Sequence, residues 1–111
     1  MCLNILFDRY TKTEADTLEY FAELAISEKN WPEAQALLKE ATAIRHKIEG
    51  EKHPAMVTLW RLWGDFYRAQ EHFEMAQEAY EQAITIGKFT LDTNHPTMTQ
   101  IITLLSTIQI Q

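Results

Sequence analysis

Cysteine, glycine and proline are all scarce in this chain, and each scarcity excludes a class of structure. The single cysteine, Cys2, cannot form an intramolecular disulfide, and no cysteine spacing typical of a metal site exists. Three glycines and three prolines in 111 residues leave too little turn-forming sequence for an all-β or doubly wound fold. The common residues are instead those that lose little side-chain freedom in a helix. We therefore expect a single, nearly all-helical domain.

Runs of positive charge and long apolar runs are missing as well. The net charge is -6, and no stripe of Lys and Arg could neutralise a phosphate backbone, so we expect no direct binding to nucleic acid or membrane. The longest apolar stretch, residues 101–105, is far too short to span a bilayer. Residues 1–7 lack the basic flank and cleavage site of a signal peptide. A protein or peptide partner and a cytoplasmic location are the expectations.

What the sequence does contain is an internal repeat. The motifs His53-Pro54-Ala55-Met56 and His95-Pro96-Thr97-Met98 stand 42 residues apart, which is typical of an array of stacked units. Aligning residues 11–52 with 53–94 pairs residues of similar size, among them Leu18 with Trp60, Phe21 with Trp63, Ala22 with Gly64, Trp31 with Phe73, Leu38 with Tyr80 and Ala41 with Ala83. The repeat therefore predicts binding rather than catalysis.

Each copy contains two helical stripes. Large apolar residues recur at i, i+3 and i+6 in the first stripe, which predicts a buried helix face: Leu18, Phe21 and Leu24, then Trp60, Trp63 and Phe66. A second stripe follows a short break in each copy. Pro32, Pro54 and Pro96 suit the first turn of a helix, and Gly50 suits a left-handed stop. Small residues such as Gly64 mark places where paired helices approach closely. Each unit is thus a helix, a tight turn and a longer helix.

These residues resemble a known family. The stretch Trp60-x2-Trp63-Gly64-x2-Tyr67, followed by Ala76-x3-Tyr80-x2-Ala83, is similar to the tetratricopeptide repeat. The 42-residue period and the His-Pro openings resemble its kinesin-light-chain variety, although Arg61 replaces an asparagine usual there. The resemblance implies antiparallel helix-turn-helix repeats stacked as a short right-handed α-solenoid. It divides the single domain into a partial repeat at residues 1–10, repeats at 11–52 and 53–94, and a partial repeat or cap at 95–111.

By the same resemblance, the first helices of successive repeats line a concave groove that binds a partner. The expected groove positions are Asp16, Glu19, Glu23, Thr58, Arg61, Asp65, Arg68, Gln100, Thr103 and Thr107. Chaperone-tail recognition is disfavoured, because carboxylates occupy the positions where a basic clamp would be needed. Arg61 and Arg68 either bind a partner or pair with a carboxylate, such as Asp65 on the same helix or Glu19 and Glu23 on the neighbouring unit.

The last helix leaves the oligomeric state open. Ile101, Leu104, Leu105 and Ile108 are expected to pack inward, while Ile102 and Ile110 widen the apolar face. An uncovered stacking face is an association site, so the chain either forms a homo-oligomer through this helix or continues in a larger array. Alternatively, the threonines and glutamines of this helix make it a cap.

No catalytic, cofactor or metal constellation is apparent. The histidines lack the i, i+4 spacing of paired ligands, so we expect helix-terminal hydrogen bonds from them instead. No nucleophile elbow or glycine-rich phosphate loop exists. We expect a non-enzymatic interaction scaffold without metal or cofactor. The alternatives are a structural or oligomerisation segment of a larger array and the sensor region of a bacterial regulator.

Overall fold

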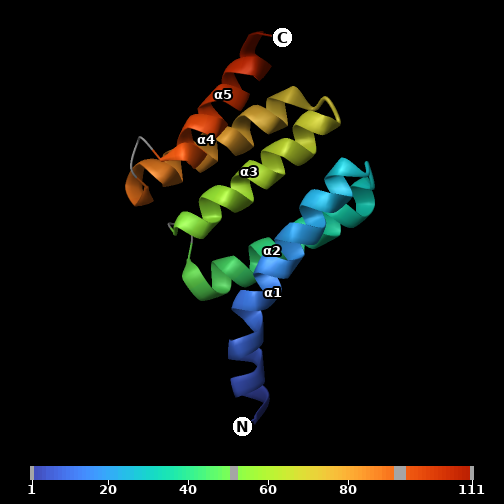
Figure 1. Ribbon diagram of the computed structural model, residues 1–111, viewed down its shortest axis with the longest axis vertical. Coiled ribbons are helices and arrows are strands. Elements are labelled where there is room, and N and C mark those ends of the chain that lie inside the picture. The colour runs from blue at the N-terminus through green and yellow to red at the C-terminus, as the bar shows by residue number, and fades with distance from the viewer. Residues whose placement is uncertain (1, 51–52, 92–94, 111) are drawn as a thin grey trace.

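In the computed structural model the chain forms a row of helices: α1 (Cys2–Ser27), α2 (Trp31–Glu49), α3 (Pro54–Ala69), α4 (Phe73–Thr90) and α5 (Pro96–Ile110). The structure describes residues 2–50, 53–91 and 95–110, with only the backbone at 2–13, 49, 109 and 110. Helix α1 packs on α2 and α3 packs on α4, while α5 lies against α4 and α3 (Figure 1). The expected all-α solenoid of stacked helix pairs is confirmed.

The two turns inside the helix pairs are copies of each other. Lys29 and Glu71 occupy equivalent positions and both have left-handed backbones, with φ of 62° and 63°. One residue later, the amides of Asn30 and His72 donate to the carbonyls of Ala25 and Tyr67, each at 2.9 Å. This bond satisfies a carbonyl that the helix end would otherwise leave unpaired. The repeat therefore extends to the backbone conformation of single residues.

The His-Pro-x-Met motifs open α3 and α5 in the same way. The Nδ1 atoms of His53 and His95 accept hydrogen bonds from the amides two residues on, at 3.1 and 3.2 Å. The following proline begins each helix, where its missing N–H costs nothing. Met56 and Met98 are buried. The prediction of helix-terminal hydrogen bonding is confirmed for these two histidines.

Gly64 allows α3 and α4 to approach closely. A Cβ atom at this position would lie 2.4 Å from Cε1 of the buried Tyr80, well inside the van der Waals distance. The predicted role of Gly64 is therefore confirmed. Gly50 ends the second helix as expected, with φ 81° and ψ 177°, a backbone conformation open essentially to glycine alone.

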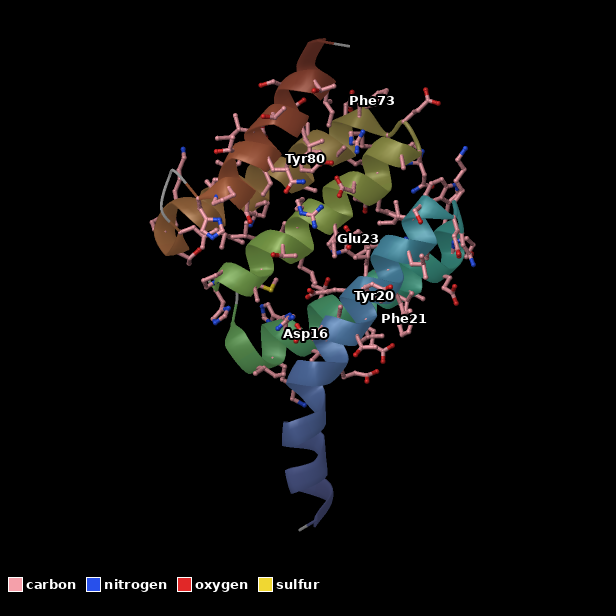
Figure 2. All side chains as sticks on the ribbon, viewed as in Figure 1. Asp16, Tyr20, Phe21, Glu23, Phe73 and Tyr80 are labelled. Atoms are coloured by element: carbon pink, nitrogen blue, oxygen red, sulfur yellow. The ribbon has the colours of Figure 1, made fainter. Side chains whose placement is uncertain are left out.

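The predicted buried stripe of α1 is wrong for two of its three members. Leu18 is buried, but Phe21 and Leu24 are 47% and 44% exposed, and Ala15, Ala22 and Ala25 form the rest of the buried face. Each step of three residues places the next side chain roughly 60° farther around the helix. A stripe of three such residues therefore faces two directions, and it is buried only if neighbouring helices cover both. Helix α3 has α2 and α4 as neighbours, whereas α1 packs on α2 and on part of α3. Figure 2 shows Phe21 on the side of α1 that faces away from α3.

Helix α5 behaves largely as expected. Ile101 and Ile108 are buried, Leu104 and Leu105 pack against the same core, and Ile102 is exposed. The side chain of Ile110 lies outside the described residues. At the other end, α1 runs unbroken from Cys2 to Ser27, so no turn separates residues 2–10 from the helix that follows them. The chain does not fold back there as a preceding repeat would require.

Candidate binding surface

Asp65 of α3 is the centre of a polar network between α3 and α4. Its Oδ1 accepts a hydrogen bond from the hydroxyl of Tyr80, and its Oδ2 accepts one from Nη1 of Arg61 at 2.8 Å. Arg68 donates through Nε to the Tyr80 oxygen at 3.3 Å, and its Nη2 lies 3.9 Å from Asp65 Oδ1. Three polar positions of one helix are thereby held in place by one another.

Tyr80 keeps its proton in this network. The side chain is fully buried, and this burial is the main cause that raises the pKa of Tyr80 far above its ordinary value. The hydrogen bond to Asp65 and the charge of that carboxylate raise the pKa further, while Arg68 opposes them. Both effects of Asp65 disfavour the phenolate, because a phenolate could not donate and would face a like charge. The phenol therefore serves as a fixed donor to Asp65.

A weaker contact links this network to α1. Nη2 of Arg61 lies 3.9 Å from Oε2 of Glu23, and the Glu23 side chain is 60% exposed whereas that of Arg61 is 16% exposed. Figure 2 shows Glu23 on the side of α1 that faces α3. Two of the expected pairs, Arg61 with Asp65 and Arg61 with Glu23, are therefore present.

Asp16 and Glu19 pair with a residue that sequence reasoning missed. Nη2 of Arg45 on α2 contacts Asp16 Oδ1, and its Nε donates to Glu19 Oε2 at 2.8 Å. Arg45 is 6% exposed. A signal for it existed, because Arg45 follows Leu38 and Ala41 at the spacing of the buried α2 stripe.

The remaining predicted positions lie on α3 and α5 and bear no charge. Thr58 is half-buried, while Gln100, Thr103 and Thr107 are exposed. The hydroxyls of Thr103 and Thr107 donate to carbonyls one turn earlier on α5, at 2.9 and 3.0 Å. Helix α3 contacts both α1 and α5, so the three first helices follow one another side by side. The predicted positions thus run from acidic on α1, through mixed charge on α3, to neutral and polar on α5.

The other aromatic residues of α3 belong mainly to packing. Trp63 stacks on Tyr67 with ring centroids 5.8 Å apart, and both contact Phe66 edge to face. Trp31 of α2 meets Phe66 at 6.2 Å. Among the described residues, no three His, Cys, Asp or Glu side chains lie close enough together to hold a metal ion.

Comparison with known proteins identifies the class of this chain. The sequence profile of the tetratricopeptide repeat matches residues 13–106, so the chain belongs to the tetratricopeptide repeat family. Repeats of this family generally mediate protein–protein interactions. None of the described helices combines the length and the apolar character needed to cross a membrane.

The chain is also similar to part of one curated protein. The chain is 31% identical over 81 residues to the RxLR effector protein SFI4 of Phytophthora infestans (strain T30-4). The aligned region is 73% of this chain and 24% of the relative, so the chain spans about a quarter of that protein's length.

Proposed function

We propose that the chain is a non-enzymatic scaffold of the 42-residue, kinesin-light-chain-like variety, which binds a partner peptide or protein along its first helices in the cytoplasm. The partner surface, here called the groove, consists of the ten positions Asp16, Glu19, Glu23, Thr58, Arg61, Asp65, Arg68, Gln100, Thr103 and Thr107. The observation that carries the proposal is the side-by-side order of α1, α3 and α5. Their groove side chains are acidic on α1, of mixed charge on α3 and uncharged on α5.

The exposed charges define the segment that would fit. At the α1 end the side chains of Asp16 and Glu23 are 69% and 60% exposed, so they can accept bonds from a cationic residue. Arg68 on α3 is the most exposed arginine of the network at 41%, while Arg61 is enclosed by carboxylates. The groove therefore suits an extended segment with a Lys or Arg near α1, an acidic or amide residue near Arg68, and polar residues along α5. A nucleic acid would be repelled at the α1 end.

The test compares charge reversals inside and outside the groove. A peptide array is first screened with the wild-type protein, and the best binder is then titrated against Glu23→Lys, Arg68→Gln and the exposed control Glu40→Lys of α2. We expect Glu23→Lys to weaken binding by about tenfold and Glu40→Lys, with the same change in net charge, to leave it unchanged. Equal affinities of all variants would rule the groove out. Arg61→Glu is unsuitable, because it would place a third carboxylate beside Glu23 and Asp65.

A further inference from the structure

A second hollow lies on the outer side of the array, away from the groove. This depression, here called the outer hollow, is open to solvent and has a volume of about 580 Å³. It is lined by Lys39, Thr42, Ala43, His46 and Lys47 of α2 and by Trp63 of α3. The α2 residues follow each other at i, i+3, i+4, i+7 and i+8, so they share one helix face. On α3, Trp63 points roughly opposite to Arg61 and Asp65, given the 100° step between helical residues.

The hollow exists because α2 and α4 do not meet. No Cα atom of α2 lies within 8 Å of one of α4 in the described structure, although both flank α3. Aromatic side chains of α3 occupy the space between them: Trp63, stacked on Tyr67, and Trp60. Next to the hollow, Trp60 and Tyr67 line a smaller depression of about 280 Å³ together with residues of α4. These aromatic side chains of α3, here called the floor, thus lie between α2 on one side and α4 on the other.

The floor is held rigidly. The indole N–H of Trp63 donates to Oγ1 of Thr42 at 2.9 Å, and that hydroxyl donates in turn to the carbonyl of Leu38 at 2.7 Å. Contacts with Phe66 and Tyr67 fix the ring from its other sides. A fixed aromatic surface binds a side chain without the entropic cost of ordering its own rotamer.

The charge of the outer hollow is opposite to that of the chain. The net charge of the protein is -6, and the arginines with described side chains, Arg45, Arg61 and Arg68, all face carboxylates. Among the described residues that line the hollow there is no carboxylate, and the exposed Lys39 lies at its rim. His46 and Lys47 make interactions of their own, so Lys39 is the cation offered to a partner. Charge complementarity therefore favours an anionic partner here, in contrast to the α1 end of the groove.

We propose that the outer hollow binds an acidic amphipathic segment of a protein partner. An apolar side chain of that segment rests on Trp63 and Ala43, and a carboxylate of the segment faces Lys39. Hot spots of protein interfaces commonly combine an aromatic pocket with charged neighbours at its rim. This site is separate from the groove, so the two proposals can fail independently.

The indole N–H of Trp63 provides the readout. Isotope-labelled protein is titrated with a short synthetic peptide of Leu, Phe and Glu in amphipathic order, and with its counterpart carrying Lys in place of each Glu. The indole signals come from three tryptophans, and a Trp63→Phe sample identifies that of Trp63. We expect the acidic peptide to shift the Trp63 signal in a saturable way and the basic peptide to leave it in place.

Variants on exposed positions of α2 locate the binding. Ala43→Glu fills the hollow with a negative charge, and Lys39→Glu reverses its rim, so each should weaken binding of the acidic peptide by about tenfold. Lys88→Glu, on an exposed position of α4 outside the hollow, carries the same change in net charge as Lys39→Glu and is the matched control, so it should bind like wild type. Three results would each overturn the proposal: no saturable shift of Trp63, equal shifts with both peptides, or an acidic peptide that perturbs Arg61 and Arg68 instead.

Discussion

The two helix pairs place their helices alike but fill the space between them differently. In the α1–α2 pair, Ala22 and Leu38 belong to one buried cluster, and alanines make up most of the buried residues of the two helices. At the equivalent positions of the α3–α4 pair, Gly64 faces Tyr80. A smaller residue on one helix is matched by a larger one on the other, so the helices are packed in both cases. The repeat conserves the combined volume of a contact rather than its residues.

The two pairs also differ in whether a charged side chain lies between their helices. The first pair encloses Arg45 between α2 and the carboxylates of α1. The equivalent residue of the second pair is Gly87, where a Cβ atom would lie 2.2 Å from Sδ of Met98. Helix α5 thus packs its motif methionine into the space that a side chain would take. Substituting the residues that distinguish the pairs tests this comparison directly.

The largest effect is expected from Gly64→Ala. The added methyl group would overlap Tyr80, which is fully buried and cannot move aside, so α3 and α4 must separate. We expect the free energy of unfolding to fall by about 3 kcal/mol in chemical denaturation. The double variant Gly64→Ala/Tyr80→Leu reproduces the Ala22 and Leu38 combination of the first pair and should recover part of the loss. A double variant less stable than Gly64→Ala alone would contradict the volume exchange.

Arg45→Met should be next, with a loss of about 2 kcal/mol, because it leaves one mostly buried acceptor unsatisfied while Asp16 is exposed to water. Methionine keeps an apolar side chain at this position but removes the guanidinium that donates a hydrogen bond to Glu19. The Glu19 carboxylate is mostly buried and would lose this donor. Thermal unfolding at neutral pH measures the change. Adding Glu19→Gln removes the stranded charge and should return part of the stability, whereas an additive further loss would show that the ion pair is not the cause.

Tyr80→Phe tests the network of the second pair, at a cost of about 1 to 2 kcal/mol. It also gives a pH signature. Because the pKa of Tyr80 is raised above 10.0, its value before folding, its stabilising contribution is complete below pH 10 and declines as the pH rises above that value. Chemical denaturation of wild type and Tyr80→Phe at several pH values above 10 should show that the free energy of unfolding declines more steeply for wild type. Parallel declines would contradict the assignment.

The smallest effects are expected at the histidine caps. His53→Ala and His95→Ala each remove the acceptor for an N-terminal amide and should cost about 1 kcal/mol. Asparagine is a good capping residue, so His→Asn at either position should retain most of the stability. Denaturation curves of the four variants provide the comparison. Alanine and asparagine variants of equal stability would mean that the caps contribute nothing.

Features that depend on neighbours in the sequence could be predicted. The proline starts, the Gly50 stop and the histidine bonds are determined within one or two turns. The bond from Arg61 to Asp65 followed from their i, i+4 spacing, and local geometry fixes each of these features. The close approach at Gly64 joins two helices, but it could be predicted from the small residues at equivalent positions of the repeat.

Features that depend on which helices lie alongside could not be predicted. Phe21 and Leu24 are exposed because no helix covers that side of α1. The apolar spacing in the sequence shows which residues share a helix face, but it does not show whether another helix covers that face. The pairing of Glu19 with Arg45 depends on how α1 and α2 are rotated against each other. The outer hollow likewise depends on the separation of α2 from α4, a distance that no residue pattern specifies.

The neighbour-only packing of this array has a consequence for how it folds. Among the described residues, every helix contact involves helices that are adjacent or next to adjacent along the chain, so each loop that must close is short. Proteins with such local contacts fold quickly, since little chain entropy is lost before contacts form. We expect folding to nucleate in the α3–α4 pair, which is covered on both sides, and unfolding to begin at α1.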